Sequence, residues 1–209
     1  GMRDEVPYAE PGSAPVGVLR SDGAANPPRE YLLLRPWRDA DLEPYAAMNS
    51  DPEVMRYFPA LLSKAESAAS MERLRRAIDE RGWGFWAVEI DGVFAGITGL
   101  NAPDFSAHFT PCIEIGWRFR REFWGRSLAY RAAKQALAFG LESLKLTEIV
   151  SFTAAGNLRS RRLMERLRFE RDASGDFDHP KLPPGHELRR HVLYHFVNFS
   201  RAPTVKMSG

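Results

Sequence analysis

Residues 112–144 change abruptly from a strand pattern to a helix pattern, and this change limits the fold more than any other feature of the chain. From Cys112 to Arg120, apolar and polar side chains alternate, as they do in a strand with two different faces. The short turn Phe123-Trp124-Gly125-Arg126-Ser127 follows, and from Leu128 to Leu144 apolar residues recur at helical spacing. A strand that leads through a small-residue turn into a long helix is typical of α/β domains.

The rest of the chain predicts further strands and helices on both sides of this unit. A capping box at Ser63-Lys-Ala-Glu66 marks the start of one helix, and Gly82 marks its end. Asp91-Gly92 is a strong hairpin signal. The predicted strands are 31–34, 84–89, 93–100, 148–153 and 191–197; the predicted helices are 39–49, a short one opening at Asp51-Pro52, 63–81 and 157–167; and 172–186 is a loop. We therefore expect one mixed α/β domain over residues 30–199, with an N-terminal arm at 1–29 and a loose tail at 200–209.

Charge and composition exclude several classes of protein. The 209 residues include 29 Lys and Arg against 27 Asp and Glu, a net charge of +2, which does not favour nucleic acid as a partner. We find no apolar run near the ~20 residues of a membrane helix and no secretory signal pattern. Cys112 is the single cysteine, which excludes an internal disulfide and a multi-cysteine zinc site. We expect a cytoplasmic protein without a metal.

Arginines concentrate in two places, which points to a small anionic ligand. One cluster spans residues 118–126 and the other spans residues 159–168. A nucleic-acid binder that uses the second cluster is the rival interpretation, and the near-zero net charge speaks against it.

The turn before the helix at Leu128 is the strongest candidate for an anion site. A helix N-terminus exposes unpaired N–H groups and a partial positive charge, and small residues at Gly125, Ser127 and Ala129 allow a phosphate to approach the backbone. An ordinary turn with solvated arginines is the alternative. Gly125 to Ala129 also lies one residue away from the nucleophile elbow of serine hydrolases, with Ser127 as nucleophile, although the preceding hairpin does not fit that fold.

A second helix start follows the strand at 148–153. Asn157 is a natural N-cap, and Ser160 lies on the same helical face as Leu163, Met164 and Leu167. The hydroxyl of Ser160 therefore points toward the sheet and needs a partner there. That partner is either a backbone carbonyl one turn back or a ligand atom between two strands.

These two sites together resemble the GNAT acetyltransferase superfamily, and most closely its ribosomal-protein N-terminal (alanine) acetyltransferase-like branch. The resemblance covers residues 31–197. It rests on the motifs Leu34-Arg35-Pro36-Trp37, Asp51-Pro52-Glu53-Val54-Met55, Ile113-Glu114-Ile115-Gly116-Trp117, Trp124-Gly125-Arg126-Ser127-Leu128-Ala129, Asn157-x-x-Ser160 and Leu167-x-Phe169.

The resemblance implies a fold, a cofactor and a reaction. The fold would be a central, mostly antiparallel mixed sheet of about 6–7 strands flanked by helices, with a V-shaped splay between the fourth and fifth strands. The reaction would move the acetyl group of acetyl-CoA to a primary amine, on a protein N-terminus or a small molecule. Backbone groups of Trp117, Arg118 and Phe119 would pair with pantetheine, and those of Trp124, Gly125, Arg126, Ser127, Leu128 and Ala129 would hold the diphosphate. Asn157 would bond the pantetheine arm.

Two residues become candidates for catalysis. Ser160 would donate a hydrogen bond to the leaving thiolate, and a backbone N–H near Trp117 or Arg118 would meet the oxyanion. Glu114 would serve as general base, directly or through water, unless it forms a salt bridge with an arginine instead. The loop residues Asp176, Asp178 and His179 are further candidates for the base, with turn capping by the aspartates as the alternative.

Two departures from the family pattern remain. Ser127 and Arg168 stand where the family usually has glycine, and the serine Cβ tolerates a positive φ less well. A CoA-binding module without catalysis is therefore an alternative function. The sequence does not identify the acceptor, and it leaves the oligomeric state open, with a homodimer as one candidate.

Overall fold

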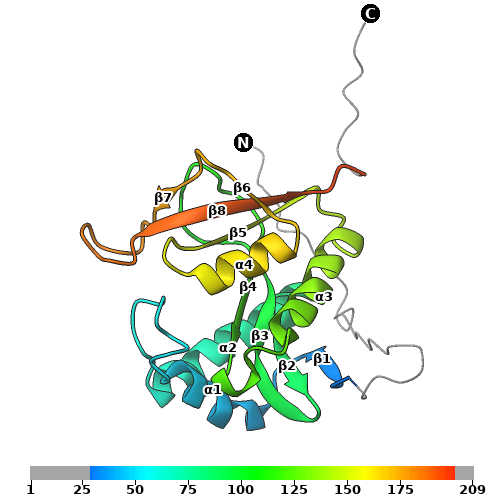
Figure 1. The fold of residues 1–209 in the computed structure, drawn as a ribbon. Helices are drawn as coiled ribbons and strands as arrows, with labels where there is room; N and C mark the ends of the chain where they lie inside the picture. Colours follow the sequence, from blue (N-terminus) through cyan, green and yellow to red (C-terminus); the bar gives the residue numbers. More distant parts are fainter. Residues whose placement is uncertain (1–28, 201–209) are drawn as a thin grey trace, which may run out of the picture.

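An eight-stranded mixed sheet organises residues 29–200, the part of the chain that the computed structural model describes (Figure 1). The spatial order of its strands is β1-β2-β3-β4-β5-β8-β6, with β7 also paired to β8. All of these pairs are antiparallel except β4–β5. The strands are β1 Leu32–Arg35, β2 Phe85–Ile90, β3 Val93–Asn101, β4 Glu114–Phe119, β5 Glu148–Ala154, β6 Glu170–Arg171, β7 Phe177–Asp178 and β8 Arg190–Val197.

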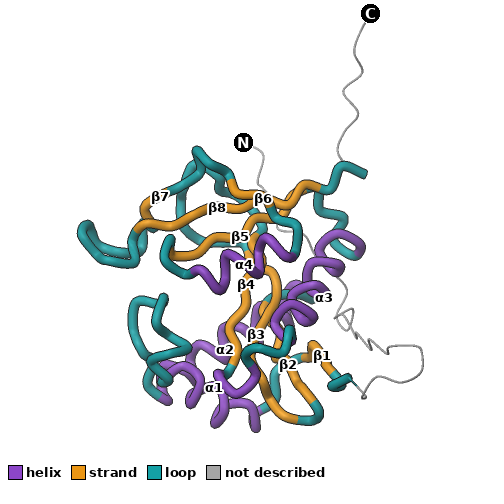
Figure 2. Tube along the Cα trace, viewed as in Figure 1, coloured by secondary structure: helices purple, strands orange, loops and turns teal. Residues whose placement is uncertain are grey.

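Four α-helices and two short 3₁₀ turns connect these strands (Figure 2). They are η1 Asp39–Asp41, α1 Leu42–Asn49, α2 Lys64–Arg81, η2 Arg121–Phe123, α3 Leu128–Glu142 and α4 Leu158–Arg166. The predicted capping box is present, since Ser63 and Glu66 each bond the other's backbone N–H, and Gly82 ends α2 at φ 81°. The predicted hairpin turn is present too, with Asp91 at φ 48° and Gly92 at φ 81°.

The mixed α/β fold class is confirmed, and two local predictions need correction. The helix expected to open at Asp51-Pro52 is wrong, because residues 51–58 form a series of turns. The carboxylate of Asp51 accepts the N–H of Glu53 at 3.0 Å, and such a local side-chain bond competes with helix formation. The loop expected at 172–186 contains β7, and β6 lies just before it, so the sheet has eight strands rather than 6–7. Strands of two residues are too short to show an alternating pattern.

The helices cover both faces of the sheet. Trp117 and Arg118 are neighbours in β4 and therefore point to opposite faces. The indole of Trp117 contacts Ser160 in α4, whereas the guanidinium of Arg118 contacts Asn49 at the end of α1. Trp86 of β2 packs edge-on against Phe139 of α3, with ring centroids 5.1 Å apart. Helices α1 and α2 thus lie on the Arg118 face, and α3 and α4 lie on the Trp117 face.

Two apolar cores hold these layers together. The larger one centres on the fully buried indoles of Trp83 and Trp86 and extends across both faces of the sheet. The smaller one packs Phe105, Phe109 and Phe177 against the β5–β8 end of the sheet. Within residues 29–200, none of the helices is both long and apolar enough to cross a bilayer.

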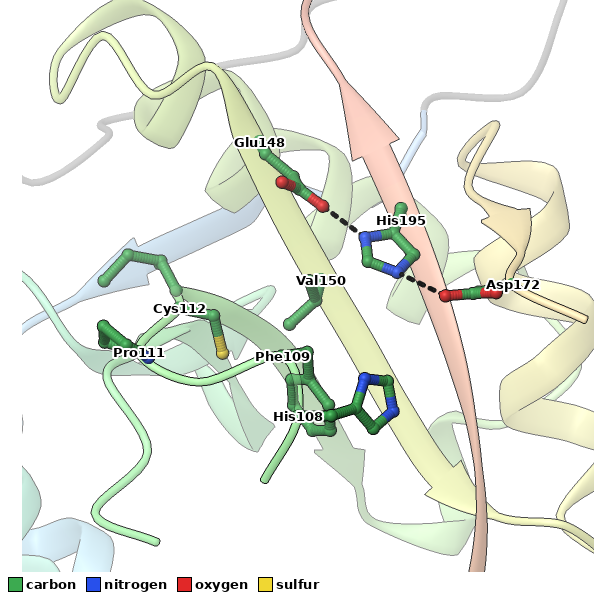
Figure 3. Close-up of a pocket in the computed structure, with 9 residues that line it drawn as sticks. His108, Phe109, Pro111, Cys112, Glu148, Val150, Asp172 and His195 are labelled. Carbon is green, nitrogen blue, oxygen red and sulfur yellow. Dashed lines mark hydrogen bonds and ion pairs between the residues drawn. The ribbon is translucent and has the colours of Figure 1, made fainter. Parts of the chain in front are cut away.

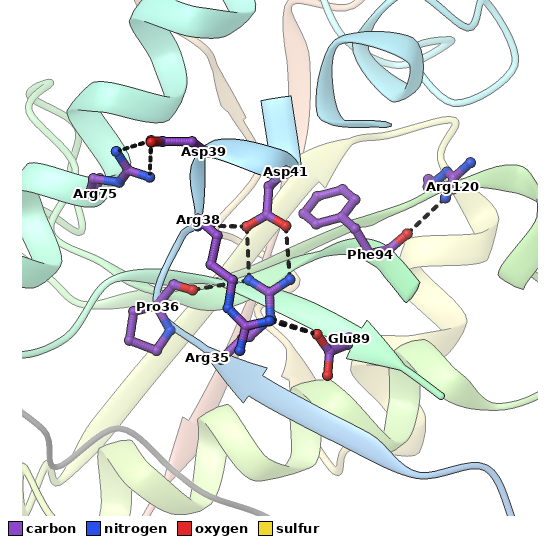
Figure 4. Close-up of polar contacts among 9 residues, drawn as sticks. All are labelled: Arg35, Pro36, Arg38, Asp39, Asp41, Arg75, Glu89, Phe94 and Arg120. Carbon is purple, nitrogen blue, oxygen red and sulfur yellow. Dashed lines mark hydrogen bonds and ion pairs between the residues drawn. The ribbon is translucent and has the colours of Figure 1, made fainter. Parts of the chain in front are cut away.

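A buried ion-pair cluster fixes the first strand to the helical layer (Figure 4). Arg35 of β1 donates two hydrogen bonds of 2.8 Å to the carboxylate of Asp41 and a third, of 3.0 Å, to Glu89 of β2. Asp41 also accepts the backbone N–H of Arg38 at 2.8 Å. The bond with Asp41 raises the pKa of Arg35 against the opposing effect of burial. Because each charge has partners, removing one would leave the others buried without compensation.

Candidate functional site

Strands β4 and β5 touch at one end and separate at the other. Their only register pair within the described chain is Glu114 with Val150, where the N–H of Val150 donates to the carbonyl of Ile113 at 3.0 Å. One residue further, the hydroxyl of Ser151 reaches the carbonyl of Ile115 at 3.0 Å. Beyond this point the two strands diverge, and Figure 1 shows β4 and β5 running in different directions. The backbone pairing of β4 with β5 is therefore interrupted toward its C-terminal end, and we call this interruption the gap.

The backbone of β4 presents hydrogen-bonding groups to this gap. The N–H of Arg120 donates to the carbonyl of Ala95 in the β3 direction, at 2.9 Å. Peptide groups alternate in direction along a strand, so those of Trp117 and Phe119 turn the other way, toward the opening. The carbonyl of Phe119 accepts the indole N–H of Trp124 at 3.0 Å. An extended ligand with amide groups could add to this strand edge, as another strand would.

The N-terminus of α3 lies at the end of β4 and has no side-chain cap. Ser127 is the N-cap residue, and its side chain makes no hydrogen bond to the helix backbone. The first intrahelical bond runs from the N–H of Arg131 to the carbonyl of Ser127, at 3.1 Å. The N–H groups of the three residues before Arg131 thus precede the helical ladder, which leaves them for an anion. Gly125 has φ 79° and open space where a Cβ would stand.

Ser127 lies in the left-handed region, with φ 58° and ψ 18°. A serine in this conformation is less favourable than glycine. Its hydroxyl accepts a hydrogen bond of 2.8 Å from Arg166 of α4. The departure from the usual glycine thus adds a contact that connects the turn to α4.

The arginines nearest this turn in the sequence are largely engaged elsewhere. Arg120 donates to the carbonyl of Phe94 at 2.8 Å, and Arg121 pairs with Asp51 at 2.9 Å. Arg131 is buried and pairs with Glu30 at 3.2 Å.

Arg126 and the α4 arginines supply the exposed charge at the turn. Arg126 lies 3.6 Å from Glu30 and stacks on the ring of Phe123. Arg159 of α4 stacks on the Trp124 ring at 3.9 Å. No local sequence pattern predicts this last contact, because it joins residues 35 positions apart.

Asn157 and Ser160 form a small polar cluster with Trp117 on the opposite side of the gap. Asn157 caps α4 by accepting the N–H of Ser160, and its amide donates to Thr153 at 3.0 Å. The hydroxyl oxygen of Ser160 accepts from two donors, the Trp117 indole at 3.3 Å and the Asn157 amide at 3.2 Å. Because both donors are N–H groups, the hydroxyl proton of Ser160 is left to donate to a third atom. Its partners are therefore side chains rather than the backbone carbonyl considered above.

Glu114 is a buried carboxyl group at the vertex of the gap. Burial raises the pKa of Glu114 to about 8, against an opposing hydrogen bond with Asn101. Its Oε2 atom has no partner. Within the described chain no arginine forms an ion pair with it, and Arg118 on the same face bonds Asn49 at 2.7 Å instead. A carboxyl group with a pKa in the neutral range and a free oxygen has the properties of a general base.

The loop residues considered as alternative bases have structural partners. Asp176 pairs with Arg171 at 3.0 Å, and Asp178 lies 3.5 Å from Arg190. The Nδ1 of His179 accepts the N–H of Lys181 at 3.2 Å, and burial lowers the pKa of this imidazole.

A cavity of about 390 Å³ lies beside this region, at the start of β5 (Figure 3). His195 stands between two carboxylates there, bonded to Glu148 and lying 3.3 Å from Asp172. The same cavity exposes Cys112, whose pKa burial raises to about 12. Neither Ser160 nor Glu114 lines it. Within the described chain, no group of three or more His, Cys, Asp or Glu residues is arranged to hold a metal ion.

Comparison with known proteins gives a consistent result. The family model described as "Acetyltransferase (GNAT) domain" matches residues 31–170. The Bacillus subtilis (strain 168) protein YkkB is 28% identical over 143 residues, which is 66% of this chain and 81% of the relative. A GNAT-family acetyltransferase from Bacillus anthracis superposes with a TM-score of 0.65 at 24% identity, covering 79% of this chain and 94% of that one. The spermidine N-acetyltransferase from Vibrio cholerae superposes with a TM-score of 0.64 at 18% identity, covering 82% and 98%.

Proposed function

Because the chain belongs to the GNAT acetyltransferase family, we propose that it acetylates a primary amine with acetyl-CoA held in the gap between β4 and β5. Family membership makes it an acetyl-CoA-dependent N-acetyltransferase. The proposal concerns three further points: which residues act in the reaction, which amine is the acceptor, and to which branch of the family the chain belongs. The observation that carries it is the divergence of two parallel strands next to an uncapped helix N-terminus.

The carrier would lie along the open edge of β4. The pantetheine amides would pair with the backbone at Trp117 and Phe119, and the diphosphate would meet the N–H groups from Trp124 to Ala129. The backbone groups of Arg118, expected to join them, face β3 instead, because Arg118 pairs with Ile97 in the same phase as Arg120 with Ala95. The free amides at the start of α3 and the αL geometry of Ser127 support this placement. The side chain of Asn157 lies across the gap and would bond the pantetheine arm.

Ser160 would assist departure of the CoA thiolate. When the amine attacks the thioester carbon, a tetrahedral oxyanion forms, and an N–H of β4 at the gap would stabilise it. Collapse of this intermediate breaks the C–S bond and leaves a thiolate, which takes up a proton. The hydroxyl of Ser160 already accepts two N–H donors, so its own proton is directed away from them, to a thiolate in the gap.

Glu114 would take the proton that the amine loses. The acceptor is a cation at neutral pH and must lose a proton to become nucleophilic. Glu114 lies at the vertex, where the strands still touch, with one unpartnered oxygen. The proton would pass to it directly or through one water.

Two classes of amine fit the proposed reaction as acceptors. The sequence motifs resemble the branch that acetylates protein N-termini, whereas one structural neighbour is a spermidine N-acetyltransferase. Both kinds of acceptor are primary amines, and the same carrier site and proton transfers serve either one. The assignment of the domain to residues 30–199, the cytoplasmic location and a homodimeric state also remain predictions.

An amine-panel assay with mass-spectrometric detection tests this function. We expect acetyl transfer from acetyl-CoA to at least one amine, among N-terminal peptides and polyamines. Ser160→Ala should lower kcat by about a hundredfold while CoA binding stays within a few-fold. Ser143→Ala, at an exposed position after α3, is the matched control and should leave kcat unchanged. Calorimetry that shows no CoA binding would contradict the proposal, and binding without transfer to any amine would favour the non-catalytic module.

A further inference from the structure

The side chain of Arg118 lies on the face of β4 opposite Trp117, and therefore on the other side of the sheet from α4 and Ser160. We propose that its guanidinium binds a carboxylate of the acceptor, so that the enzyme acetylates amines that also carry a carboxylate, as amino acids do. This inference rests on the proposed function, because it concerns the second substrate of the same reaction.

The guanidinium of Arg118 contacts neutral groups. It donates to the Oδ1 atom of Asn49 at 2.7 Å, and its carbon atom lies 5.0 Å from the centroid of the Phe58 ring and 6.0 Å from that of Tyr45. Its Nε atom is buried and has no partner. Burial lowers the pKa of this guanidinium, and Tyr45 opposes the effect. A desolvated cation with neutral neighbours gains most from a carboxylate.

Arg35 and Arg131, which lie deeper in the protein, show the usual arrangement. Arg35 pairs with Asp41 at 2.8 Å, and Arg131 pairs with Glu30 at 3.2 Å. Among the residues that the structure describes, no Asp or Glu lies within ion-pair distance of Arg118, and its hydrogen bond goes to an amide. A guanidinium that the fold desolvates without pairing departs from the ordinary pattern, and such departures concentrate at functional sites.

Two buried polar residues of the helical layer hold Arg118 in position. The amide nitrogen of Asn49, at the end of α1, donates to the hydroxyl of Ser67 in α2 at 3.1 Å, and neither residue is exposed. This bond orients the amide so that its oxygen faces Arg118. The guanidinium is thus fixed by a neutral group, whereas an aspartate in place of Asn49 would compensate its charge.

Arg118 shares its face of β4 with Glu114, the proposed base. The two residues are four positions apart, a separation of about 13 Å between Cα atoms in a strand. Gly116 lies between them, and a Cβ there would stand 3.2 Å from the ring of Phe85. An apolar ring therefore separates the two charged groups. An acceptor that lies over this ring places its amine toward Glu114 and its carboxylate toward Arg118.

The segment between α1 and α2 connects Arg118 with the far side of the gap. A Cβ at Gly156, in the turn after β5, would lie 3.7 Å from the ring of Tyr57, so this segment reaches from the end of α1 to the start of α4 (Figure 1). Phe58, the next residue, is 36% exposed and lies against the guanidinium. Arg118 is itself partly exposed, which leaves it accessible to a small molecule.

The charge at Arg118 separates the classes of amine that the reaction could use. A polyamine would bring a second ammonium group toward the guanidinium, and two like charges at this place repel each other. An amino acid instead offers two carboxylate oxygens, which match the planar fork of an arginine.

Steady-state kinetics with matched pairs of acceptors tests the inference. Each amino acid of a panel, from α-amino acids to ω-amino acids of increasing length, is compared with its own amide, which keeps the amine and lacks the negative charge. We expect the wild type to favour at least one amino acid over its amide by about tenfold or more in kcat/KM, mainly through KM.

Two variants remove the uncompensated charge in different ways. Arg118→Gln deletes the guanidinium, and Asn49→Asp gives it an internal carboxylate of nearly the same shape as the amide. In both variants the ratio of kcat/KM for the amino acid over its amide should fall to about one. Arg73→Gln, at an exposed position of α2, is the matched control and should keep the wild-type ratio. Should circular dichroism show that Arg118→Gln is unfolded, Asn49→Asp decides.

The outcomes separate this inference from the proposed function. Acetyl transfer to peptides or polyamines, with a ratio near one for every matched pair, overturns the inference while the proposed function stands. A wild-type ratio that persists in Asn49→Asp also overturns it, because the guanidinium is then not the group that selects the acceptor. The absence of transfer to any amine refutes the proposed catalysis and this inference with it.

Discussion

Replacing Glu114 by glutamine should change both the stability and the activity of the protein in a pH-dependent way. Glu114 is buried at the vertex of the β4–β5 gap, and its folded-state pKa is about 8 against an ordinary value of 4.5. A carboxyl group whose pKa rises on folding stabilises the fold most below its unfolded pKa. This contribution is lost as the pH rises from 4.5 toward 8, because the folded protein must then hold a buried carboxylate.

The size of the effect follows from the difference between the two pKa values. That difference corresponds to about 5 kcal/mol in the free energy of unfolding between pH 4.5 and pH values above 8. Glutamine has nearly the same shape and does not titrate, so the Glu114→Gln variant should gain stability relative to wild type as the pH rises. Urea unfolding at pH 5, 7 and 9 measures this, with Glu142→Gln at an exposed position of α3 as control.

The activity of the wild type should rise with pH, whereas the stabilising contribution of Glu114 falls. About a tenth of Glu114 is ionised at pH 7 if its pKa is about 8, so kcat/KM should rise with pH through this value. Glu114→Gln should remove this rise and lower kcat/KM by about a hundredfold at pH 8. If Glu114→Gln differed from wild type in stability by the same amount at pH 5 and at pH 9, Glu114 would not be a buried carboxyl group that is protonated at low pH. Persistence of the rise in the variant would remove Glu114 as the base.

Three further perturbations probe the rest of the structure. Asp41→Ala leaves the buried guanidinium of Arg35 with Glu89 as its remaining ion-pair partner and should cost about 3–5 kcal/mol in urea unfolding; a cost below about 1 kcal/mol would show that the cluster is not desolvated. Gly99→Ala places a Cβ 1.9 Å from the carbonyl oxygen of Gly84 and should prevent folding, as judged by circular dichroism. Its control is Gly92→Ala, which has open space at φ 81° and should cost only about 1–2 kcal/mol; comparable costs would contradict the close approach of β3 to the carbonyl of Gly84. The half-buried Cys112 thiol, with its pKa raised to about 12, should react with iodoacetamide at pH 7.5 at least a hundredfold more slowly in the folded protein than in urea, and equal rates would show that the fold does not raise this pKa.

Side-chain periodicity and capping residues predicted most of the fold because they act locally. The alternation in β4, the capping box before α2 and the Asp-Gly turn between β2 and β3 depend on neighbours within a few positions. The small-residue turn before α3 and the N-cap at Asn157 were visible for the same reason, and they lie beside the gap. The turns at 51–58 and the two-residue strands were not predicted, because a local Asx bond and very short pairings leave little periodic pattern.

The sequence by itself determined which backbone segments border the gap between β4 and β5, whereas only the tertiary structure decided which side chains meet there. A serine at 127 was readable as a departure from glycine, but its bond to Arg166 joins residues 39 positions apart. Glu114 was readable as a candidate general base on the predicted strand, but its raised pKa depends on burial by segments distant in the chain. Local patterns encode backbone conformation through short-range sterics and hydrogen bonds. Desolvation and charge pairing depend on long-range packing, which becomes defined only when the chain has folded.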